Sequence, residues 1–314
     1  METPPDLCHL LHPVTLRHLA QDWLREDVPH FDYGGFAVGE RRETAELLLK
    51  SPGVLAGAPF FQAVFEELGC AVEWRQREGV PLQPVCQVAS VRGKVRHILL
   101  GERVALNCLA RASGIASACR RVVELAEGAG WQGQLAGTRK TTPGFRLVEK
   151  FAMMVGGVST HRYDLSSMIM LKDNHVRSAG DVAQAVRDGR KVGGLFTKIE
   201  VESRSLEEAR EAARAGADIV MLDNFTPQGA LGTAQLLKAE FPGVLIEASG
   251  GISEDTLGQY FSSHVDIISL GSLTQNVTAL DFSLKLVGEQ GANNGAGGTG
   301  PSSETPPGRR NFAF

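Results

Sequence analysis

The fold of this chain is decided by Val244-Leu-Ile-Glu-Ala-Ser-Gly-Gly251 and by Asp266-Ile-Ile-Ser-Leu-Gly-Ser272. Both stretches predict a short apolar strand that ends in hydroxyl and glycine residues. Strands that are apolar almost throughout are typical of parallel sheets buried on both faces. Glycine at a strand end lets backbone N–H groups approach an anion, so the two strand ends predict a phosphate site.

Four earlier segments repeat this form, with helical patterns such as Ser205 to Ala215 and Thr233 to Glu240 between them. The four segments are Gln134 to Thr138, Met168 to Lys172, Phe196 to Glu202 and Asp218 to Asn224. Repeated strand–helix units imply parallel strands, and both an α/β barrel and an open doubly wound sheet satisfy that pattern. We favour the barrel, because nearly every strand ends in a charged, hydroxyl or glycine residue and a barrel gathers those ends at one mouth.

The region before these units predicts a mixed α/β structure. Ala58 to Leu68 has helical spacing, and Cys70 to Trp74 alternates as a half-buried strand does. Pro81 to Arg96 predicts two β segments with Arg92-Gly93-Lys94 as the turn. From Leu99 to about Ala126 the apolar positions recur at helical spacing, and Ser113-Gly114 is a candidate break in that helix.

Composition places the chain among ordinary globular proteins. Its 314 residues are 43% hydrophobic and 22% charged, and the formal net charge is −4. That balance gives no support for nucleic-acid binding, and no apolar run approaches the ~20 residues that span a bilayer. The five cysteines form no Cys-x-x-Cys pair, and the first residues do not form a signal-peptide pattern. We therefore expect reduced thiols and a cytoplasmic location.

Cations are concentrated at three strand ends of this acidic chain. They lie in Gly137-Thr-Arg-Lys-Thr-Thr-Pro-Gly144, in His161-Arg162 and in Lys172-Asp-Asn-His175. Such a cluster suits a small ligand with several negative charges, although Arg139 and Lys140 alone fit solvated loop charges and Arg162 alone fits a surface salt bridge. Lys172 ends a wholly apolar strand, which predicts a buried stem and an anionic partner or a catalytic role.

Acidic side chains end two further strands. Glu202 and Asp223 at a barrel mouth suit Mg²⁺ or a cationic transition state, or they are counter-ions that hold the lysines in place. Glu200 shares strand parity with Glu202, so either carboxylate fits the inward position.

Several motifs together resemble the quinolinate phosphoribosyltransferase family, closest to its animal form, over Pro13 to Leu286. They are Gly101-Glu-Arg-Val-Ala-Leu-Asn107, Gly137 to Gly144, His161-Arg162, Lys172 to His175, Leu222-Asp-Asn224 and Glu247-Ala-Ser-Gly-Gly-Ile252. The resemblance implies a decarboxylating transferase of NAD synthesis. It would convert quinolinate and phosphoribosyl pyrophosphate to nicotinate mononucleotide, pyrophosphate and CO₂, with Mg²⁺ and no organic cofactor.

The resemblance also implies roles for single residues. Catalytic roles fall on Lys140, Lys172, Glu202 and Asp223, and the last two are also the candidates for Mg²⁺. The quinolinate-binding residues are Arg139, His161, Arg162 and Lys172, with Arg103 contributed by a partner subunit. Thr138 accompanies them, and the 5′-phosphate cradle matches Ser249, Gly250, Gly251 and Gly271.

The implied architecture is an N-terminal α/β sandwich followed by an incomplete, TIM-like α/β barrel. We expect the sandwich over residues 1–115, the barrel over 116–275, a helix returning to the sandwich over 276–290, and a disordered tail over 291–314. The family further implies a homodimer as the catalytic unit, within a hexamer built as a trimer of dimers, with no nucleic acid or membrane as partner.

Three other functions share parts of this pattern. A nicotinate phosphoribosyltransferase would handle a monocarboxylate and need fewer cations. A Schiff-base aldolase would use Lys172 as its nucleophile. A non-catalytic metabolite-binding protein would keep the phosphate cradle without needing both lysines and both acids.

Overall fold

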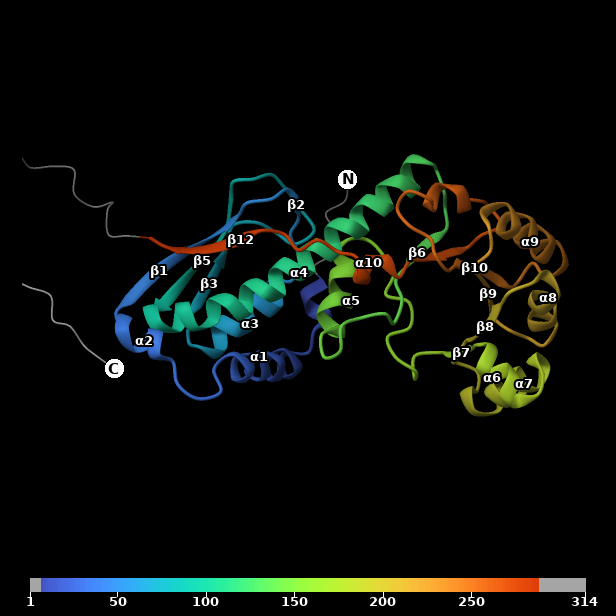
Figure 1. Ribbon diagram of the computed structural model, residues 1–314, viewed down its shortest axis with the longest axis horizontal. Helices are drawn as coiled ribbons and strands as arrows, with labels where there is room; N and C mark the ends of the chain where they lie inside the picture. The colour runs from blue at the N-terminus through green and yellow to red at the C-terminus, as the bar shows by residue number, and fades with distance from the viewer. Residues whose placement is uncertain (1–6, 288–314) are drawn as a thin grey trace, which may run out of the picture.

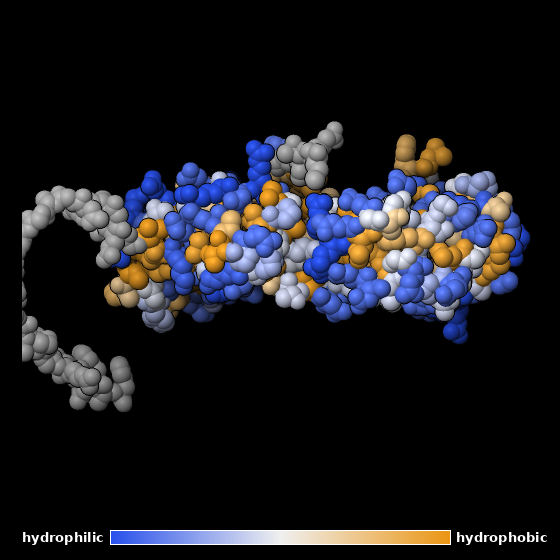
Figure 2. All heavy atoms as spheres, turned by 90° about the horizontal axis from the view of Figure 1, so that it is seen from above, coloured by the Kyte–Doolittle hydropathy of each residue, from blue (hydrophilic) through white to orange (hydrophobic). Residues whose placement is uncertain are grey.

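The computed structural model describes residues 7–287, which form an elongated molecule with one sheet at each end (Figure 1). An antiparallel sheet lies at one end and a parallel sheet at the other. The helix α4 (Val95–Gly128) runs between them. Figure 2 shows hydrophilic residues over much of one long face, interrupted by smaller apolar areas.

The antiparallel sheet has the strand order β12-β1-β5-β3. Its strands are β1 (Arg42–Leu49), β3 (Ala71–Trp74), β5 (Cys86–Lys94) and β12 (Phe282–Leu286), and a separate pair joins β2 (Gly53–Val54) to β4 (Pro81–Leu82). The accompanying helices are η1 (Leu7–Leu10), α1 (Pro13–Asp27), α2 (Tyr33–Val38) and α3 (Ala58–Glu67). One apolar core joins Leu47 of β1, Phe61 and Phe65 of α3, and Leu109 of α4, so helices cover the sheet in the expected sandwich.

The parallel sheet has the order β6-β11-β10-β9-β8-β7, so its first strand pairs with its last. The strands are β6 (Gln134–Ala136), β7 (Ile169–Leu171), β8 (Ile199–Ser203), β9 (Ile219–Asp223), β10 (Leu245–Ser249) and β11 (Ile267–Ser269). A single parallel bridge joins Ala136 to Ser159, and no ladder within residues 7–287 links that segment to β7. The sheet is therefore an incomplete barrel, as predicted.

Helices surround this sheet on its outer side (Figure 1). They are α5 (Arg146–Val155), α6 (Asp173–Ala179), α7 (Val182–Gly193), α8 (Leu206–Arg214), α9 (Pro227–Glu240), η2 (Leu257–Tyr260) and α10 (Ser272–Gln275). Side-chain oxygens cap several of them. Asp181, Ser205 and Thr226 each accept the backbone N–H three residues on, which stabilises the first turn of α7, α8 and α9.

Three local predictions were wrong. The helix expected over 276–290 is replaced by β12, which pairs antiparallel with β1, because Phe282-Ser-Leu-Lys-Leu286 alternates with a period of two. The turn at Arg92-Gly93-Lys94 lies inside β5, and the chain continues directly into α4.

The third is the break at Ser113-Gly114, since α4 is continuous there. The Ser113 hydroxyl instead hydrogen-bonds the backbone N–H and C=O of Ala56, each at 3.0 Å. The small residues thus allow a close approach and do not end the helix. The predicted boundary at residue 115 also falls inside this helix, and the predicted tail over 291–314 lies outside the described residues.

Within residues 7–287, which contain all five cysteines, none forms a disulfide bond. Within residues 7–287, no helix combines the length and the apolar character that crossing a bilayer requires.

Candidate functional site

The predicted site residues follow the C-terminal ends of the parallel strands. Thr138, Arg139 and Lys140 follow β6, and His161 and Arg162 follow the segment that bridges to it. Lys172 follows β7, while Glu202 and Asp223 lie at the ends of β8 and β9. The glycine-rich turns come after β10 and β11. Parallel strands present these ends at one edge, so the residues gather at one mouth.

Arg139 and Arg162 form an unpaired cationic couple at this mouth. Burial lowers the pKa of Arg162 below its usual range, and the nearby charge of Arg139 lowers it further. The Nε atom of Arg139 is buried without a hydrogen-bond partner. Throughout residues 7–287, no group accepts a hydrogen bond from either guanidinium. Two guanidinium groups held close together without an acceptor suit a ligand with paired carboxylates.

Lys172 is paired with a carboxylate in this structure. Its Nζ atom contacts Oε2 of Glu202, and its side chain is 43% exposed, against 7% for Glu202. The expectation of a buried lysine stem was therefore wrong, because β7 is followed at once by the exposed helix α6. The predicted anionic partner is present within the chain.

The carboxylates of Glu202 and Asp223 lie close enough to influence each other. Burial raises the pKa of Asp223, and the charge of Glu202 raises it further. Asn224 donates to Oδ2 of Asp223 at 2.7 Å. Two acids that repel one another next to a predicted pyrophosphate subsite have the donor chemistry that Mg²⁺ prefers, so these residues fit that ion.

The turn after β10 is shaped for close approach of a ligand to the backbone. Gly250 has φ = +93°, and a Cβ there would lie 2.4 Å from Oδ1 of Asn224. Ser249 precedes it, with its hydroxyl 2.8 Å from that of Ser269. Lys140 belongs to the same region, since a Cβ on Gly271 would lie 3.0 Å from Cδ of this lysine.

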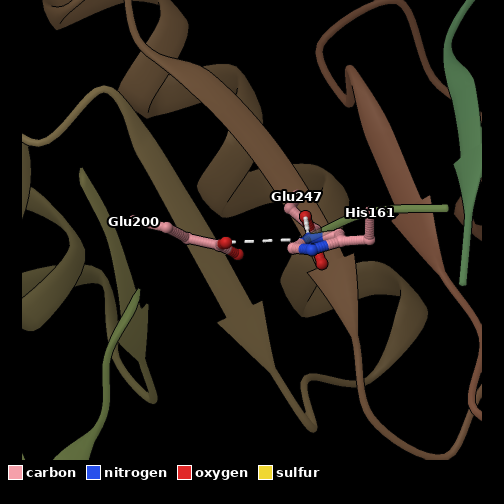
Figure 3. Close-up of side chains that lie close together, drawn as sticks. All are labelled: His161, Glu200 and Glu247. Atoms are coloured by element: carbon pink, nitrogen blue, oxygen red, sulfur yellow. Dashed lines mark hydrogen bonds and ion pairs between the residues drawn. The ribbon is translucent and has the colours of Figure 1, made fainter. Parts of the chain in front are cut away.

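His161 uses both ring nitrogens within the chain. Its Nε2 lies 3.0 Å from Oε2 of Glu247 (Figure 3), and its Nδ1 accepts from the backbone N–H of Arg162 at 2.7 Å. Both ring nitrogens are therefore occupied within the chain. His161 also has φ = +55°, an unusual backbone conformation outside glycine. This arrangement orients the ring against Glu247.

Glu200 and Glu247 complete a buried cluster around His161 (Figure 3). Glu247 also accepts from the Ser269 hydroxyl at 2.6 Å. Glu200 is fully buried, its two oxygens have no hydrogen-bond partner, and Oε2 lies 3.6 Å from Nε2 of His161. Burial, and then the charge of Glu247, raise the pKa of Glu200 well above its usual range. These surroundings favour the protonated form of Glu200.

This cluster also has the spacing of a metal site, because one ligand atom from each of His161, Glu200 and Glu247 lies within 4.8 Å of the others. The positive charge of Arg162 already faces Glu200, which reduces the need for a cation. Sequence reasoning left the orientation of Glu200 open and gave Glu247 no role. The sequence did contain a signal for both residues, since each is a carboxylate inside an otherwise apolar strand.

Sequence reasoning also missed Glu149 and Lys150, adjacent buried charges in α5. Glu149 accepts from Arg111 at 2.9 Å and from the Thr142 hydroxyl at 2.8 Å. Arg111 donates to the Thr274 carbonyl at 2.5 Å, and the Thr274 hydroxyl donates to the backbone carbonyl of Lys140 at 2.7 Å. This network fixes the loop after β6 against α4 and α10.

Arg103 is not part of the mouth of its own chain. It is exposed on the first third of α4, and among the described residues nothing hydrogen-bonds or pairs with it. Figure 1 shows the start of α4 beside the antiparallel sheet, whereas the parallel sheet lies beyond its other end.

A cavity of about 1670 Å³ lies away from this mouth. Its lining comes from α1, α3 and the turn after α5, and none of the predicted site residues contributes to it.

Comparison with known proteins agrees with these observations. Residues 33–113 and 115–285 match the family models described as the N-terminal and C-terminal domains of quinolinate phosphoribosyl transferase. The human nicotinate-nucleotide pyrophosphorylase [carboxylating] is 56% identical over 284 residues, which cover 90% of this chain and 96% of that protein. This relative confirms the expected likeness to animal members.

Solved bacterial structures share the fold. NadC from Streptococcus pyogenes superposes with a TM-score of 0.81 at 38% identity, covering 88% of this chain and 98% of its own. The nicotinate-nucleotide pyrophosphorylase from Francisella tularensis superposes with a TM-score of 0.82 at 30% identity, covering 90% and 100%. On its sequence, its fold and the arrangement of its strand ends, this chain belongs to the quinolinate phosphoribosyltransferase family.

Proposed function

We propose that this protein catalyses the decarboxylating transfer of a phosphoribosyl group to quinolinate in NAD synthesis. The products are nicotinate mononucleotide, pyrophosphate and CO₂. The observation that carries this proposal is the couple of Arg139 and Arg162, two close guanidinium groups without an acceptor. Quinolinate has two adjacent ring carboxylates, which supply the acceptors that this couple lacks.

The remaining cations divide between the two substrates. Lys172 adds charge on the quinolinate side, where it exchanges its contact with Glu202 for a carboxylate of the ligand. Lys140 lies against Gly271 and faces the phosphoribosyl pyrophosphate. Thr138 supports that loop, because its hydroxyl accepts from the backbone N–H of Lys140 at 3.1 Å. The backbone from Ser249 to Gly251, together with Gly271, holds the 5′-phosphate.

The reaction follows from this placement. The ring nitrogen attacks the anomeric carbon as pyrophosphate leaves, and positive charge develops on the sugar. Glu202 and Asp223 stabilise that charge, and Lys140 offsets the charge on the leaving group. The same two carboxylates would hold Mg²⁺, which would supply further charge stabilisation for the pyrophosphate. The pyridinium ring then stabilises the electron pair of the C–C bond as CO₂ departs, and the ring carbon takes up a proton from solvent.

A second subunit completes the site in this proposal. Arg103 has no partner among the residues that the structure describes, and it reaches the quinolinate of its neighbour in a symmetric homodimer. A hexamer of three such dimers and a cytoplasmic location accompany this function. The aldolase alternative has less support, because Lys172 pairs with Glu202 as an ammonium, which is not nucleophilic.

One assay tests the activity. The purified chain is given quinolinate, phosphoribosyl pyrophosphate and Mg²⁺, and CO₂ release is followed together with nicotinate mononucleotide. We expect turnover that depends on both substrates. Specificity constants for nicotinate that equal those for quinolinate would reject the dicarboxylate site.

A further inference from the structure

A lysine of α5 lies beneath both loops that carry the arginine couple. Lys150 is 1% exposed, and its Nζ donates to three backbone carbonyls. These belong to Thr138 at 2.7 Å, to Thr160 in a very short contact, and to Arg162 at 3.4 Å. Thr138 directly precedes Arg139 and Thr160 directly precedes His161. One ammonium group therefore ties together the two loops that follow β6 and the Ser159 bridge.

The number of hydrogen bonds matches the charged form of this side chain. An ammonium has three N–H donors, and three carbonyls accept them, whereas a neutral amine has only two. Both loops are thus fixed at once only while Lys150 is protonated.

The charges around Lys150 do not explain its burial. Arg146, Arg139 and Arg162 all repel it, and with its burial they lower its pKa to about 8. Glu149 is the one carboxylate that favours its charge, and this acid binds Arg111 and Thr142 instead. A buried lysine without a contacting carboxylate is costly, so its retention calls for a compensating role.

We propose that Lys150 is a positioning residue, which sets the spacing of Arg139 and Arg162 and so determines the affinity for a ligand with paired carboxylates. Lys150 does not contact the ligand, because it bonds the far side of both loops through their carbonyls. This inference rests on the proposed quinolinate site. A bound dicarboxylate also adds negative charge beside Arg139 and Arg162, which repel Lys150.

The test compares Lys150→Met, which removes the ammonium and keeps the chain length, with Lys238→Met. Lys238 serves as the control, since its side chain is 18% exposed and also donates to a carbonyl, that of Val244 at 2.9 Å, away from the mouth; unlike Lys150, it also pairs with Asp266 at 2.7 Å. Quinolinate and inorganic phosphate are titrated separately into wild type and both variants by calorimetry. Failure of wild type to bind quinolinate would reject the proposed function and would be recognised before any variant is compared.

We expect Lys150→Met to weaken quinolinate binding at least tenfold and to leave phosphate binding within twofold. Faster hydrogen exchange is expected in residues 137–144 and 159–163. Lys238→Met should change neither affinity. Equal losses for quinolinate and phosphate would show a general structural role and overturn the proposal, as would unchanged quinolinate binding.

The pH dependence of binding to the wild-type protein gives a second test, which needs no folded variant. Its quinolinate affinity should fall as the pH rises through about 8, the pKa of Lys150, because the neutral amine releases one carbonyl. Guanidinium groups do not lose their protons over that range. Lys150→Gln, which keeps two N–H donors, should bind with intermediate affinity and without this decline. An affinity that is flat from pH 7 to about 9.5 contradicts the proposal.

Discussion

Nε2 of His161 lies 3.0 Å from Oε2 of Glu247, and this contact separates the roles of two buried glutamates. Glu247 accepts from His161 on one oxygen and from Ser269 on the other, so both of its oxygens are used. Glu200 has no donor on either oxygen, and its burial, followed by the charge of Glu247, raises its pKa well above the usual range. Two chemically identical side chains on nearby strands therefore differ in their surroundings, and the protonated form is favoured for Glu200.

This difference predicts that the same Glu→Gln substitution affects stability differently at the two positions. Near pH 5, Glu200→Gln should leave the melting temperature nearly unchanged, since an amide resembles a protonated acid. Glu247→Gln should cost about 1–3 kcal/mol of unfolding free energy, because its amide N–H₂ would face a donor from His161 or from Ser269. Denaturant titration of both variants measures these changes. Equal destabilisation by the two substitutions would contradict the assignment.

The pH dependence of stability should also report on Glu200. Its pKa is raised in the folded state above the ordinary value of 4.5, so the native chain keeps a proton that the unfolded chain releases. That contribution to stability is complete below pH 4.5 and is lost as the pH rises through the raised pKa. We expect the melting temperature of Glu200→Gln, relative to wild type, to increase with pH from 5 upward. A constant difference over that range would show that Glu200 ionises normally.

The strand ends were predictable from sequence, whereas the contacts beneath them were not. The apolar segments around Ile219 and Leu245 predicted parallel strands, and their polar ends predicted the mouth. The order of strands was needed to learn that the barrel stays open between Ser159 and β7.

Buried charges were the harder part. The partners of Lys150 come from two loops, and those of Glu149 come from two segments, α4 and the loop after β6. Spacing along a helix cannot reveal such distant partners. Local alternation could have identified β12, but proximity to the end of the barrel favoured a helix in the prediction.

Two lysines should be needed for turnover and dispensable for folding. Lys140 is exposed and Lys172 is 43% exposed, so replacing either by Ala removes charge without opening a cavity. We expect turnover to fall by about 10²–10³, as for other lost electrostatic donors. Steady-state kinetics and thermal melts of both variants test this, and near-normal turnover in either one would remove it from the mechanism.

The last prediction is that each active site is shared between two subunits. Arg103 is exposed on α4 at the end beside the antiparallel sheet, and Lys172 follows a strand of the barrel. Arg103→Ala and Lys172→Ala should each be nearly inactive alone. When the two variants are unfolded and reassembled together, half of the dimers pair one variant with the other, and each such dimer has one of its two sites whole. Activity should therefore recover to about a quarter of wild type. Size-exclusion chromatography with differently tagged subunits verifies mixing, and mixed dimers without activity would place Arg103 outside the neighbour's site.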